Sequence, residues 1–174
     1  QILVIAALVL GSHALHDSFG VIRWTTAGMS AGTAGFIWSE SVAAEVLVFF
    51  LIGPRIIDRL GASNTLVLSA AAGVLRWTVM ALTAAPFAMA LVEPLHGFTF
   101  ALLHLACMRV LARIVPPRWA ATAQALYGTV AIGLSAAVLT VASGALYARF
   151  GAASFGIMAG LCALGLLAAI FARD

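Results

Sequence analysis

Six ionisable side chains stand inside long apolar runs of the sequence, where a membrane-spanning segment would keep them away from water. Charged groups at membrane depth are energetically costly, and those that occur there commonly belong to ion or solute pathways. Carboxyl and imidazole groups can also exchange protons near neutral pH when burial and neighbouring charges tune them. The pattern therefore predicts that an ion or a polar solute crosses a bilayer. The six residues are Asp17, Glu45, Arg76, Glu93, His96 and His104.

The densest polar series lies in the fourth apolar run. At 3.6 residues per turn, its members would fall within about 120° of one another on a helix. Lipid does not accept such a stripe, so it must face protein or a water-filled cavity. We expect it to line a pathway, and histidines that only pack against neighbouring helices are the alternative. The stripe comprises Glu93, His96, Gly97, Phe100, His104, Cys107 and Met108.

Polar residues of the first two apolar runs could belong to the same pathway. In the first run, His13, His16 and Asp17 form one stripe, and His13 can reach Asp17 one turn later. This pair could relay protons or contact a solute, or it could simply pack the outer part of the bundle. In the second run, Trp38, Ser41 and Glu45 share one helical face.

The third and fifth runs each add a candidate. Arg76 lies near the middle of the third run, and its guanidinium needs a counter-charge because it does not readily lose its proton. Glu45 is the nearest carboxylate in depth, so we expect an Arg76–Glu45 pair that is either structural or functional. In the fifth run, Gln124 and Tyr127 are neighbours that could hydrogen-bond a solute or, equally, another helix.

The composition indicates that these runs are membrane helices. Hydrophobic residues make up 64% of the 174-residue chain and charged residues only 9%, whereas a soluble domain has about 25% charged residues. A helix needs about 20 residues to cross the hydrocarbon core, so we expect an all-α, polytopic membrane protein. The six expected spans are 2–25, 32–52, 65–84, 87–112, 120–143 and 153–172.

Charge and cysteine content exclude several other classes. All nine basic residues are arginine, and they form no run of the kind that binds nucleic acid. Cys107 and Cys162 lack metal-ligand spacing, so we expect no metal and no other cofactor. The positive-inside rule places both termini and the even-numbered loops in the cytoplasm. This orientation rests on Arg55, Arg59, Arg113, Arg118 and Arg173, against Arg23 and Arg149 on the other side.

The sequence contains an internal repeat. The segments 57–62 and 147–152 share the pattern Arg-x-Gly-Ala, and their starts are 90 residues apart (147 minus 57). Each segment follows the second span of a three-span unit, and an odd number of spans puts the two copies on opposite sides of the membrane. Inverted repeats of this kind are typical of secondary transporters. We therefore expect one six-helix domain, 1–174, built from repeat units 1–86 and 87–174.

The loop after the second span resembles a motif of the major facilitator superfamily, G-x-x-x-D-R/K-x-G-R-R/K. Two departures are a proline at the first glycine position and Ala62-Ser63-Asn64 in place of the trailing basic residues. The resemblance implies the C-terminal six-helix half of a twelve-helix fold, with a gating charge pair in this loop and a glycine suited to its tight turn. The residues concerned are Pro54, Asp58, Arg59 and Gly61, with Arg149 and Gly151 in the fifth loop.

Several strings with polar residues inside apolar runs are similar to the phenylpropionate permease group, which are proton-coupled importers related to the lactose and nucleoside symporters. The resemblance implies half of a proton-coupled symporter in a bacterial cytoplasmic membrane. The chain opens in mid-helix, as a piece of a longer polypeptide would. The expected partners are a small organic solute such as an aromatic acid, a proton, lipid, and an N-terminal six-helix half or a second copy. The strings are FIWSESVAAEVLVF, LRWTVM, LHGFTFALLHLACMR, QALYG and SGALYARFG.

Two other functions are open at this point. A rhomboid-like intramembrane serine protease needs an activated serine, but Gly133-Leu134-Ser135-Ala136 imitates only part of the G-x-S-G pattern and the sixth span has no histidine. A non-transporting assembly subunit is the second alternative. Transport is favoured if the polar residues of the fourth span share a concave surface with those of the second and fifth.

Overall fold

The computed structural model describes residues 1–172, which form helices joined by short turns, with no strand among them. Four helical runs in this range are long and apolar enough to cross a membrane, and they confirm the all-α membrane class. Arg173 and the end of the expected domain at residue 174 lie outside the described residues. The four runs are Ile2–Thr26, Ala31–Leu82, Pro86–Ile114 and Pro117–Phe171.

The first run is interrupted near its middle. It consists of α1 (Ile2–Gly11) and α2 (His13–Thr26), which are separated at Ser12. The Ser12 hydroxyl donates to the carbonyl of Val9 at 2.6 Å, so a side chain bonds a backbone acceptor beside the break. The break makes His13 the first residue of a new helix, close to backbone carbonyls of the preceding one.

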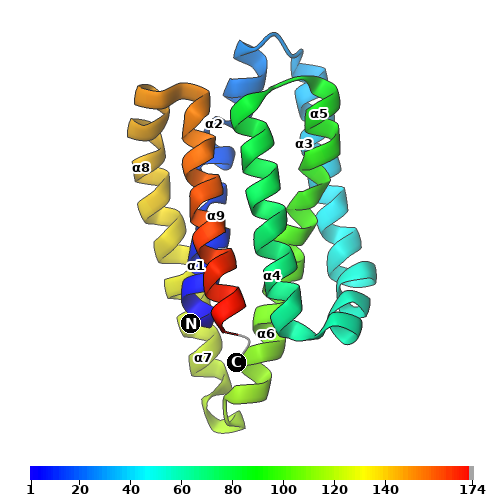
Figure 1. Ribbon diagram of the computed structural model, residues 1–174, viewed down its shortest axis with the longest axis vertical. Coiled ribbons are helices and arrows are strands. Elements are labelled where there is room, and N and C mark those ends of the chain that lie inside the picture. The colour runs from blue at the N-terminus through cyan, green and yellow to red at the C-terminus, as the bar shows by residue number, and fades with distance from the viewer. Residues whose placement is uncertain (173–174) are drawn as a thin grey trace.

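The second run is too long for a single crossing. Its 52 residues would extend about 78 Å as one straight helix, more than twice the hydrocarbon thickness. It comprises α3 (Ala31–Leu47), the π-helical η1 (Val48–Ile52) and α4 (Gly53–Leu82), and inside α4 the backbone of Gly61 has φ 77° and ψ 160°. The chain turns back there (Figure 1). Because glycine adopts positive φ without strain, the tight turn expected at Gly61 is confirmed.

The fourth run reverses direction in the same way. It has 55 residues, and Gly151 within it has a φ of 53°. Figure 1 shows the turn at the top of the molecule, between α8 and α9. Its elements are η4 (Pro117–Trp119), α7 (Ala120–Leu126), the π-helical η5 (Tyr127–Leu134), α8 (Ser135–Phe150), η6 (Gly151–Ala153) and α9 (Ser154–Phe171).

The third run is irregular where its polar residues lie. Between α5 (Pro86–Val92) and α6 (Leu103–Ile114), the chain forms the 3₁₀ segment η2 (Glu93–Leu95) and the π-helical η3 (Phe98–Leu102). A 3₁₀-helix has 3.0 residues per turn instead of 3.6, and a π-helix is wider than an α-helix. Side chains on either side of these segments therefore do not keep the common face that uniform α-helical geometry predicts.

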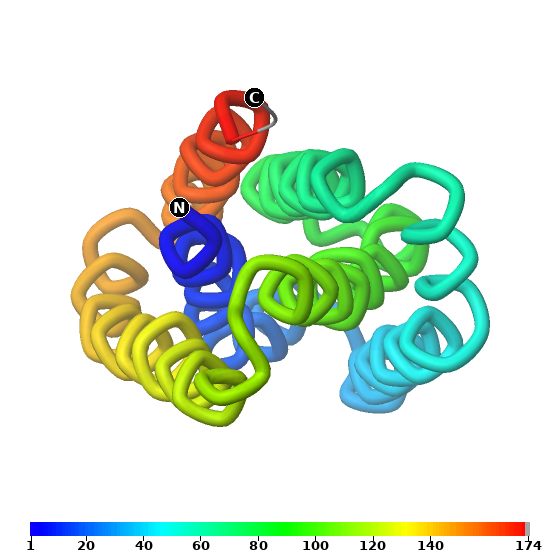
Figure 2. The backbone as a smooth tube through the Cα atoms, turned by 90° about the horizontal axis from the view of Figure 1, so that it is seen from below, coloured from blue at the N-terminus to red at the C-terminus, as the bar shows by residue number. Residues whose placement is uncertain are grey.

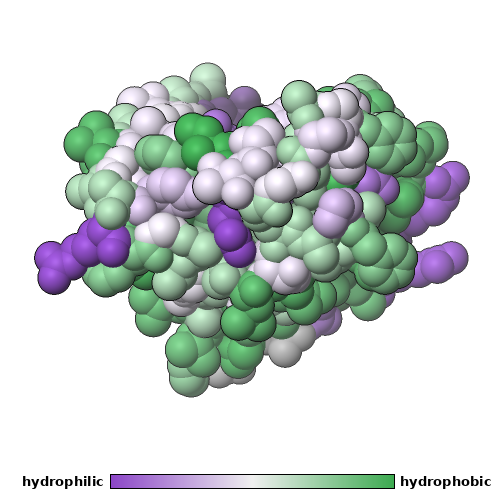
Figure 3. All heavy atoms as spheres, turned by 90° about the horizontal axis from the view of Figure 1, so that it is seen from above, coloured by the Kyte–Doolittle hydropathy of each residue, from purple (hydrophilic) through white to green (hydrophobic). Residues whose placement is uncertain are grey.

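The helices pack into a bundle with a buried aromatic core and an apolar exterior. Figure 2 shows α4 and α9 along one side, α3 and α8 along the other, and α1 and α6 between them. Trp24, Trp77 and Phe155 are fully buried, whereas Phe36 and Val141 are exposed, as lipid-facing side chains would be. Viewed from one end, the surface shows only separate hydrophilic patches among apolar and neutral residues (Figure 3).

The two ends of the described chain lie toward the same end of the bundle. In Figure 1, the beginning of α1 and the end of α9 point toward the end that carries the turn at Gly61 and helix α7. The turn at Gly151 is at the opposite end. This arrangement gives the two Arg-x-Gly-Ala segments opposite positions along the long axis of the bundle.

Candidate functional site

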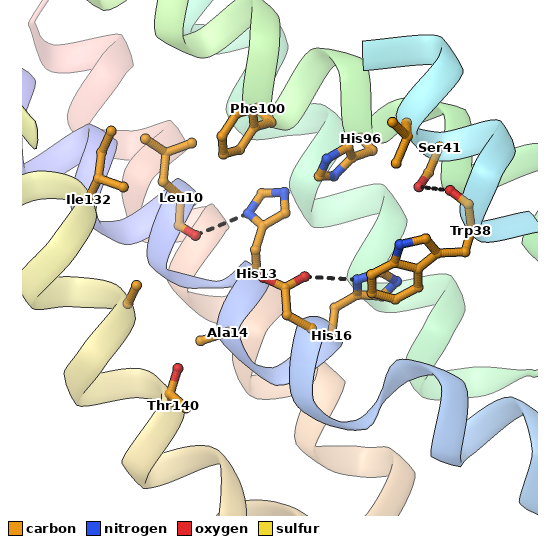
Figure 4. A pocket seen from close by; sticks show the side chains of 13 residues that line it. Leu10, His13, Ala14, His16, Trp38, Ser41, His96, Phe100, Ile132 and Thr140 are labelled. Atoms are coloured by element: carbon orange, nitrogen blue, oxygen red, sulfur yellow. Dashed lines mark hydrogen bonds and ion pairs between the residues drawn. The ribbon is translucent and has the colours of Figure 1, made fainter. Parts of the chain in front are cut away.

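A cavity of about 410 Å³ lies between α2, α3, η3 and α8. Figure 4 shows that imidazole rings and aromatic rings from different helices point toward it. A concave site of this size, mostly apolar and with a few polar groups, is the common form of a small-molecule site. Its polar lining residues are His13, His16, Asp17, Ser41, His96 and Thr140, and its aromatic ones are Trp38 and Phe100.

A buried ion pair adjoins the cavity. Arg76 Nη2 of α4 donates to Glu93 Oε2 of η2 at 2.6 Å, and neither side chain has any exposed surface. His16 of α2 extends the pair, because its Nε2 lies 3.3 Å from Glu93 Oε2 and 3.4 Å from Arg76 Nη2. The Arg76 guanidinium also lies over the ring of Trp77, 4.4 Å from its centroid. These contacts satisfy the requirement that a charge buried at membrane depth has a partner.

The second branch of the cluster reaches Glu45. Arg76 Nη1 donates to His96 Nδ1 at 3.1 Å, and His96 Nε2 lies 3.0 Å from Glu45 Oε2. Because a guanidinium can only donate, Nδ1 accepts and Nε2 carries the hydrogen that is donated to Glu45. The expected Arg76–Glu45 pair is therefore wrong: Glu93 neutralises Arg76, and His96 stands between Arg76 and Glu45.

The contacts of the first-helix stripe also differ from the expected ones. His13 does not bond Asp17: its Nδ1 lies 3.1 Å from the carbonyls of Val9 and Leu10, and its Nε2 lies 2.9 Å from Thr99 Oγ1. The imidazole bonds instead to carbonyls three and four residues earlier, as polar side chains within helices can do. The neighbour of Asp17 is instead His16, whose Nδ1 is 3.4 Å from Asp17 Oδ1.

Aromatic rings stack on the imidazoles of the cavity. The ring of His16 lies parallel to that of Trp38, with centroids 4.7 Å apart and an interplanar angle of 8°. The ring of His96 stacks on Phe100 at 5.6 Å and 15°. These stacks orient both imidazoles and give the cavity two flat surfaces suited to a planar ligand.

The lower part of the fourth-run stripe does not reach this cavity. His104 Nδ1 lies 3.2 Å from the hydroxyl of Tyr127, which is almost fully buried, and Gln124 is exposed one turn away. None of these three residues lines the cavity, and Glu93 lies in the buried cluster behind it. The expected continuous stripe is therefore divided, and only His96 and Phe100 of its polar and aromatic members face the cavity.

The motif loop contains an ion pair that the sequence did not indicate. Asp58 Oδ1 accepts a hydrogen bond from Arg109 Nη2 of α6 at 3.0 Å, so its partner belongs to a different helix and is not Arg59. Pro54 stands in the first turn of α4. In the related fifth loop, Arg149 lies over the ring of Phe150.

Two hydroxyl groups in the site were absent from the sequence-based candidates. Thr99 bonds His13, and Thr140 lines the cavity from α8. A single threonine in an apolar helix is a weak signal, because its hydroxyl can bond the backbone of its own helix. Only the spatial arrangement identifies them.

The chain belongs to the MFS_1 like family, whose model matches residues 1–157. Over 173 residues it is 38% identical to a probable 3-phenylpropionic acid transporter from Escherichia coli (strain K12), and the match covers 99% of this chain and 44% of that protein. The chain thus spans less than half the length of this relative. The comparisons confirm the superfamily resemblance and indicate a multi-pass membrane protein of a transporter class, not an enzyme.

Proposed function

We propose that this chain is one half of a proton-coupled symporter for a small aromatic acid. The observation that carries the proposal is the cavity of about 410 Å³, in which imidazoles and flat aromatic rings stand side by side at membrane depth. An aromatic carboxylate combines one group that accepts hydrogen bonds with one planar apolar group, and the cavity offers a complement to each.

The two parts of such a solute would bind different walls. His96 lines the cavity and could donate its single N–H, on Nε2, to a solute carboxylate in place of Glu45. Phe100 and Trp38 provide faces for an aromatic ring. The name of the similar Escherichia coli protein, a probable 3-phenylpropionic acid transporter, supports the same solute class.

The buried cluster supports proton coupling. It joins Asp17, His16, Glu93, Arg76, His96 and Glu45 through contacts of 2.6 to 3.4 Å. Its outer members, Asp17 and Glu45, are 61% and 28% exposed, while Arg76 and Glu93 are fully buried. Ionisable groups arranged in this way inside a membrane domain are typical of proton pathways.

We further propose that the chain makes six crossings arranged as an inverted repeat, 1–86 and 87–174. The reversals at Gly61 and Gly151 divide the two longest runs, and the two reversals lie at opposite ends of the bundle. The cytoplasmic face of a bacterial inner membrane would then carry both termini. An N-terminal six-helix half or a second copy would supply the facing wall of the cavity.

The cytoplasmic end would act as a gate. The Asp58–Arg109 pair links the turn before the third span to the fourth span at 3.0 Å, and both side chains are more than half exposed. An exposed pair is weak, so it can form in one state and separate in another without a large barrier.

Solute uptake by the complete transporter in proteoliposomes tests this function. We expect a proton gradient, inside alkaline, to drive accumulation of aromatic acids in preference to nucleosides and sugars. His96→Ala should reduce that accumulation while the protein remains inserted and monodisperse. Accumulation that does not respond to the gradient would rule out proton symport, and a preference for nucleosides or sugars would rule out the proposed solute class.

A further inference from the structure

His16 differs from the other imidazoles of the site in what its two ring nitrogens face. Nδ1 lies 3.4 Å from the carboxylate of Asp17, on the cavity side, as the dashed line in Figure 4 shows. Nε2 lies 3.3 Å from Glu93 Oε2 and 3.4 Å from Arg76 Nη2, on the buried side. Nε2 therefore has both an acceptor (Glu93) and a donor (Arg76) within reach, and Nδ1 faces an acceptor (Asp17).

This arrangement accommodates both protonation states of His16. A neutral imidazole carries one hydrogen and a protonated imidazole carries two. In the neutral form, Nε2 can donate to Glu93 while Nδ1 turns a lone pair toward Asp17. After protonation, Nδ1 also donates, and each N–H then meets a carboxylate. Neither form leaves an N–H of His16 without an acceptor.

His96 lacks this freedom. Its Nδ1 receives a hydrogen bond from Arg76 Nη1 at 3.1 Å, and a guanidinium nitrogen cannot become an acceptor. A second hydrogen on His96 would therefore point at the hydrogen of Arg76. The contact with Arg76 holds His96 in its neutral form, with its single hydrogen on the nitrogen that faces Glu45.

The charges around His16 also favour an added proton. The charged groups facing it are Asp17 from its own helix, Glu93 from η2 and Arg76 from α4, and their formal charges sum to −1 (two carboxylates and one guanidinium). Two further titratable groups lie within electrostatic range, His13 of α2 and His96 next to η2. The rings that contact His16 are neutral: Trp38 of α3 is stacked at 4.7 Å, Trp24 of α2 lies at 5.7 Å and Trp77 of α4 at 5.6 Å. One proton on His16 therefore brings the local formal charge to zero.

We infer that His16 is the residue that binds the transported proton, and that Asp17 delivers it from the cavity. This inference rests on the proposed proton coupling. Asp17 is 61% exposed and lines the cavity, whereas His16 is only 2% exposed. A proton from cavity water can add to the Asp17 carboxylate and pass to His16 Nδ1, after which Asp17 is again ionised and His16 is positive. No other group changes its charge in this step.

A pair of glutamine variants in the complete transporter tests this assignment. The amide of glutamine can donate and accept hydrogen bonds, so it imitates a neutral imidazole but cannot be protonated near neutral pH. In proteoliposomes, two rates are compared: accumulation driven by a proton gradient and exchange of internal for external solute without a gradient. For His16→Gln, we expect the ratio of accumulation to exchange to fall by about tenfold or more, within the usual range of coupling between two ligands.

His96→Gln is the matched control, because it removes an imidazole from the same cluster that the structure holds neutral. We expect it to keep the wild-type ratio of accumulation to exchange, whatever it does to the two rates themselves. A purely structural role of His16 would lower both rates together and leave the ratio unchanged, and that result would overturn the assignment. A ratio that falls equally in both variants would also overturn it.

Nuclear magnetic resonance of the histidine-labelled, detergent-solubilised transporter provides a readout independent of uptake. The signal that disappears in His16→Gln should show a second ring proton once the pH is lowered, while the signal that disappears in His96→Gln should stay neutral. A His16 ring that remains neutral throughout would overturn the inference. If His16 titrates but the wild type shows no gradient-driven accumulation, the proposed function fails while the proton site stands.

Discussion

Two ion pairs of similar length occupy opposite surroundings in this protein. Arg76 and Glu93 are 2.6 Å apart and fully buried, whereas Arg109 and Asp58 are 3.0 Å apart with more than half of each side chain exposed. Distance alone would rank them as comparable. Their burial separates them, because a charge left alone inside the bundle cannot be solvated, while a charge left alone at the exposed end can.

Because their burial differs, the two ion pairs are suited to different roles. The buried pair cannot separate without a large free-energy penalty, so it is suited to holding α4 and η2 together and to fixing the imidazoles beside it. The exposed pair can separate at little cost, so it is suited to a contact that changes during a transport cycle. A pair of intermediate burial should make an intermediate contribution to the free energy of unfolding. The His96–Glu45 contact is such a pair, because the side chain of His96 is 15% exposed and that of Glu45 is 28% exposed.

The largest effect should come from breaking the buried pair on one side. Arg76→Met removes the guanidinium that pairs with the Glu93 carboxylate, and removing one partner of a buried pair destabilises a protein by about 3–5 kcal/mol. The free energy of unfolding can be measured by titrating the purified protein with a denaturing detergent and following tryptophan fluorescence. A loss as small as that of an exposed pair would show that burial does not set the strength of these pairs.

Removing both charges should sharpen the same comparison. Replacing a buried ion pair by apolar side chains of similar volume is commonly neutral or stabilising, so Arg76→Met combined with Glu93→Met should recover most of the stability that Arg76→Met loses. The same detergent titration compares the single and double variants. If the double variant is as unstable as the sum of the two single variants, the charges act independently and not as a pair.

The sequence predicted the all-α membrane class because lipid imposes a strong pattern on membrane helices. Long apolar runs indicated that class, and Arg-x-Gly-Ala marked both turns, where Gly61 and Gly151 have positive φ. The predicted partner of Arg76 was wrong because the depth of each side chain in the membrane was counted as if every run were a uniform α-helix. With the 3₁₀ and π-helical segments in the third run, Glu93 meets Arg76, and only His96 and Phe100 of the polar and aromatic stripe face the cavity.

Contacts between a side chain and the backbone were the other feature that spacing could not reveal. His13 and Asp17 are separated by one helical turn, which normally permits a side-chain pair. His13 instead bonds to the carbonyls of Val9 and Leu10 at 3.1 Å. No proline lies near Ser12 in the sequence, so the helix interruption there could not be inferred from residue types alone.

Breaking the half-buried His96–Glu45 contact should lower the free energy of unfolding by an amount between those of the two ion pairs. Glu45→Ala removes the acceptor of the His96 N–H, and this contact is partly exposed. A hydrogen bond to a charged group contributes at least about 1.5 kcal/mol to stability, and we use this lower value because the contact is not fully buried. We expect a loss of that size in the detergent titration. A loss equal to that of Arg76→Met would show that this part of the cavity is as dry as the buried cluster.

The smallest effect on stability should come from the exposed pair. Asp58→Asn should lower the free energy of unfolding by less than about 1 kcal/mol, because water solvates Arg109 once its partner is neutral. Salt distinguishes this case further: at about 1 M the screening length is near 3 Å, so the difference between wild type and Asp58→Asn should vanish, while the loss in Arg76→Met persists. Detergent titrations at low and high salt measure both. A salt-independent loss in Asp58→Asn would mean that the pair becomes buried in the complete transporter, and the two ion pairs would then no longer differ in kind.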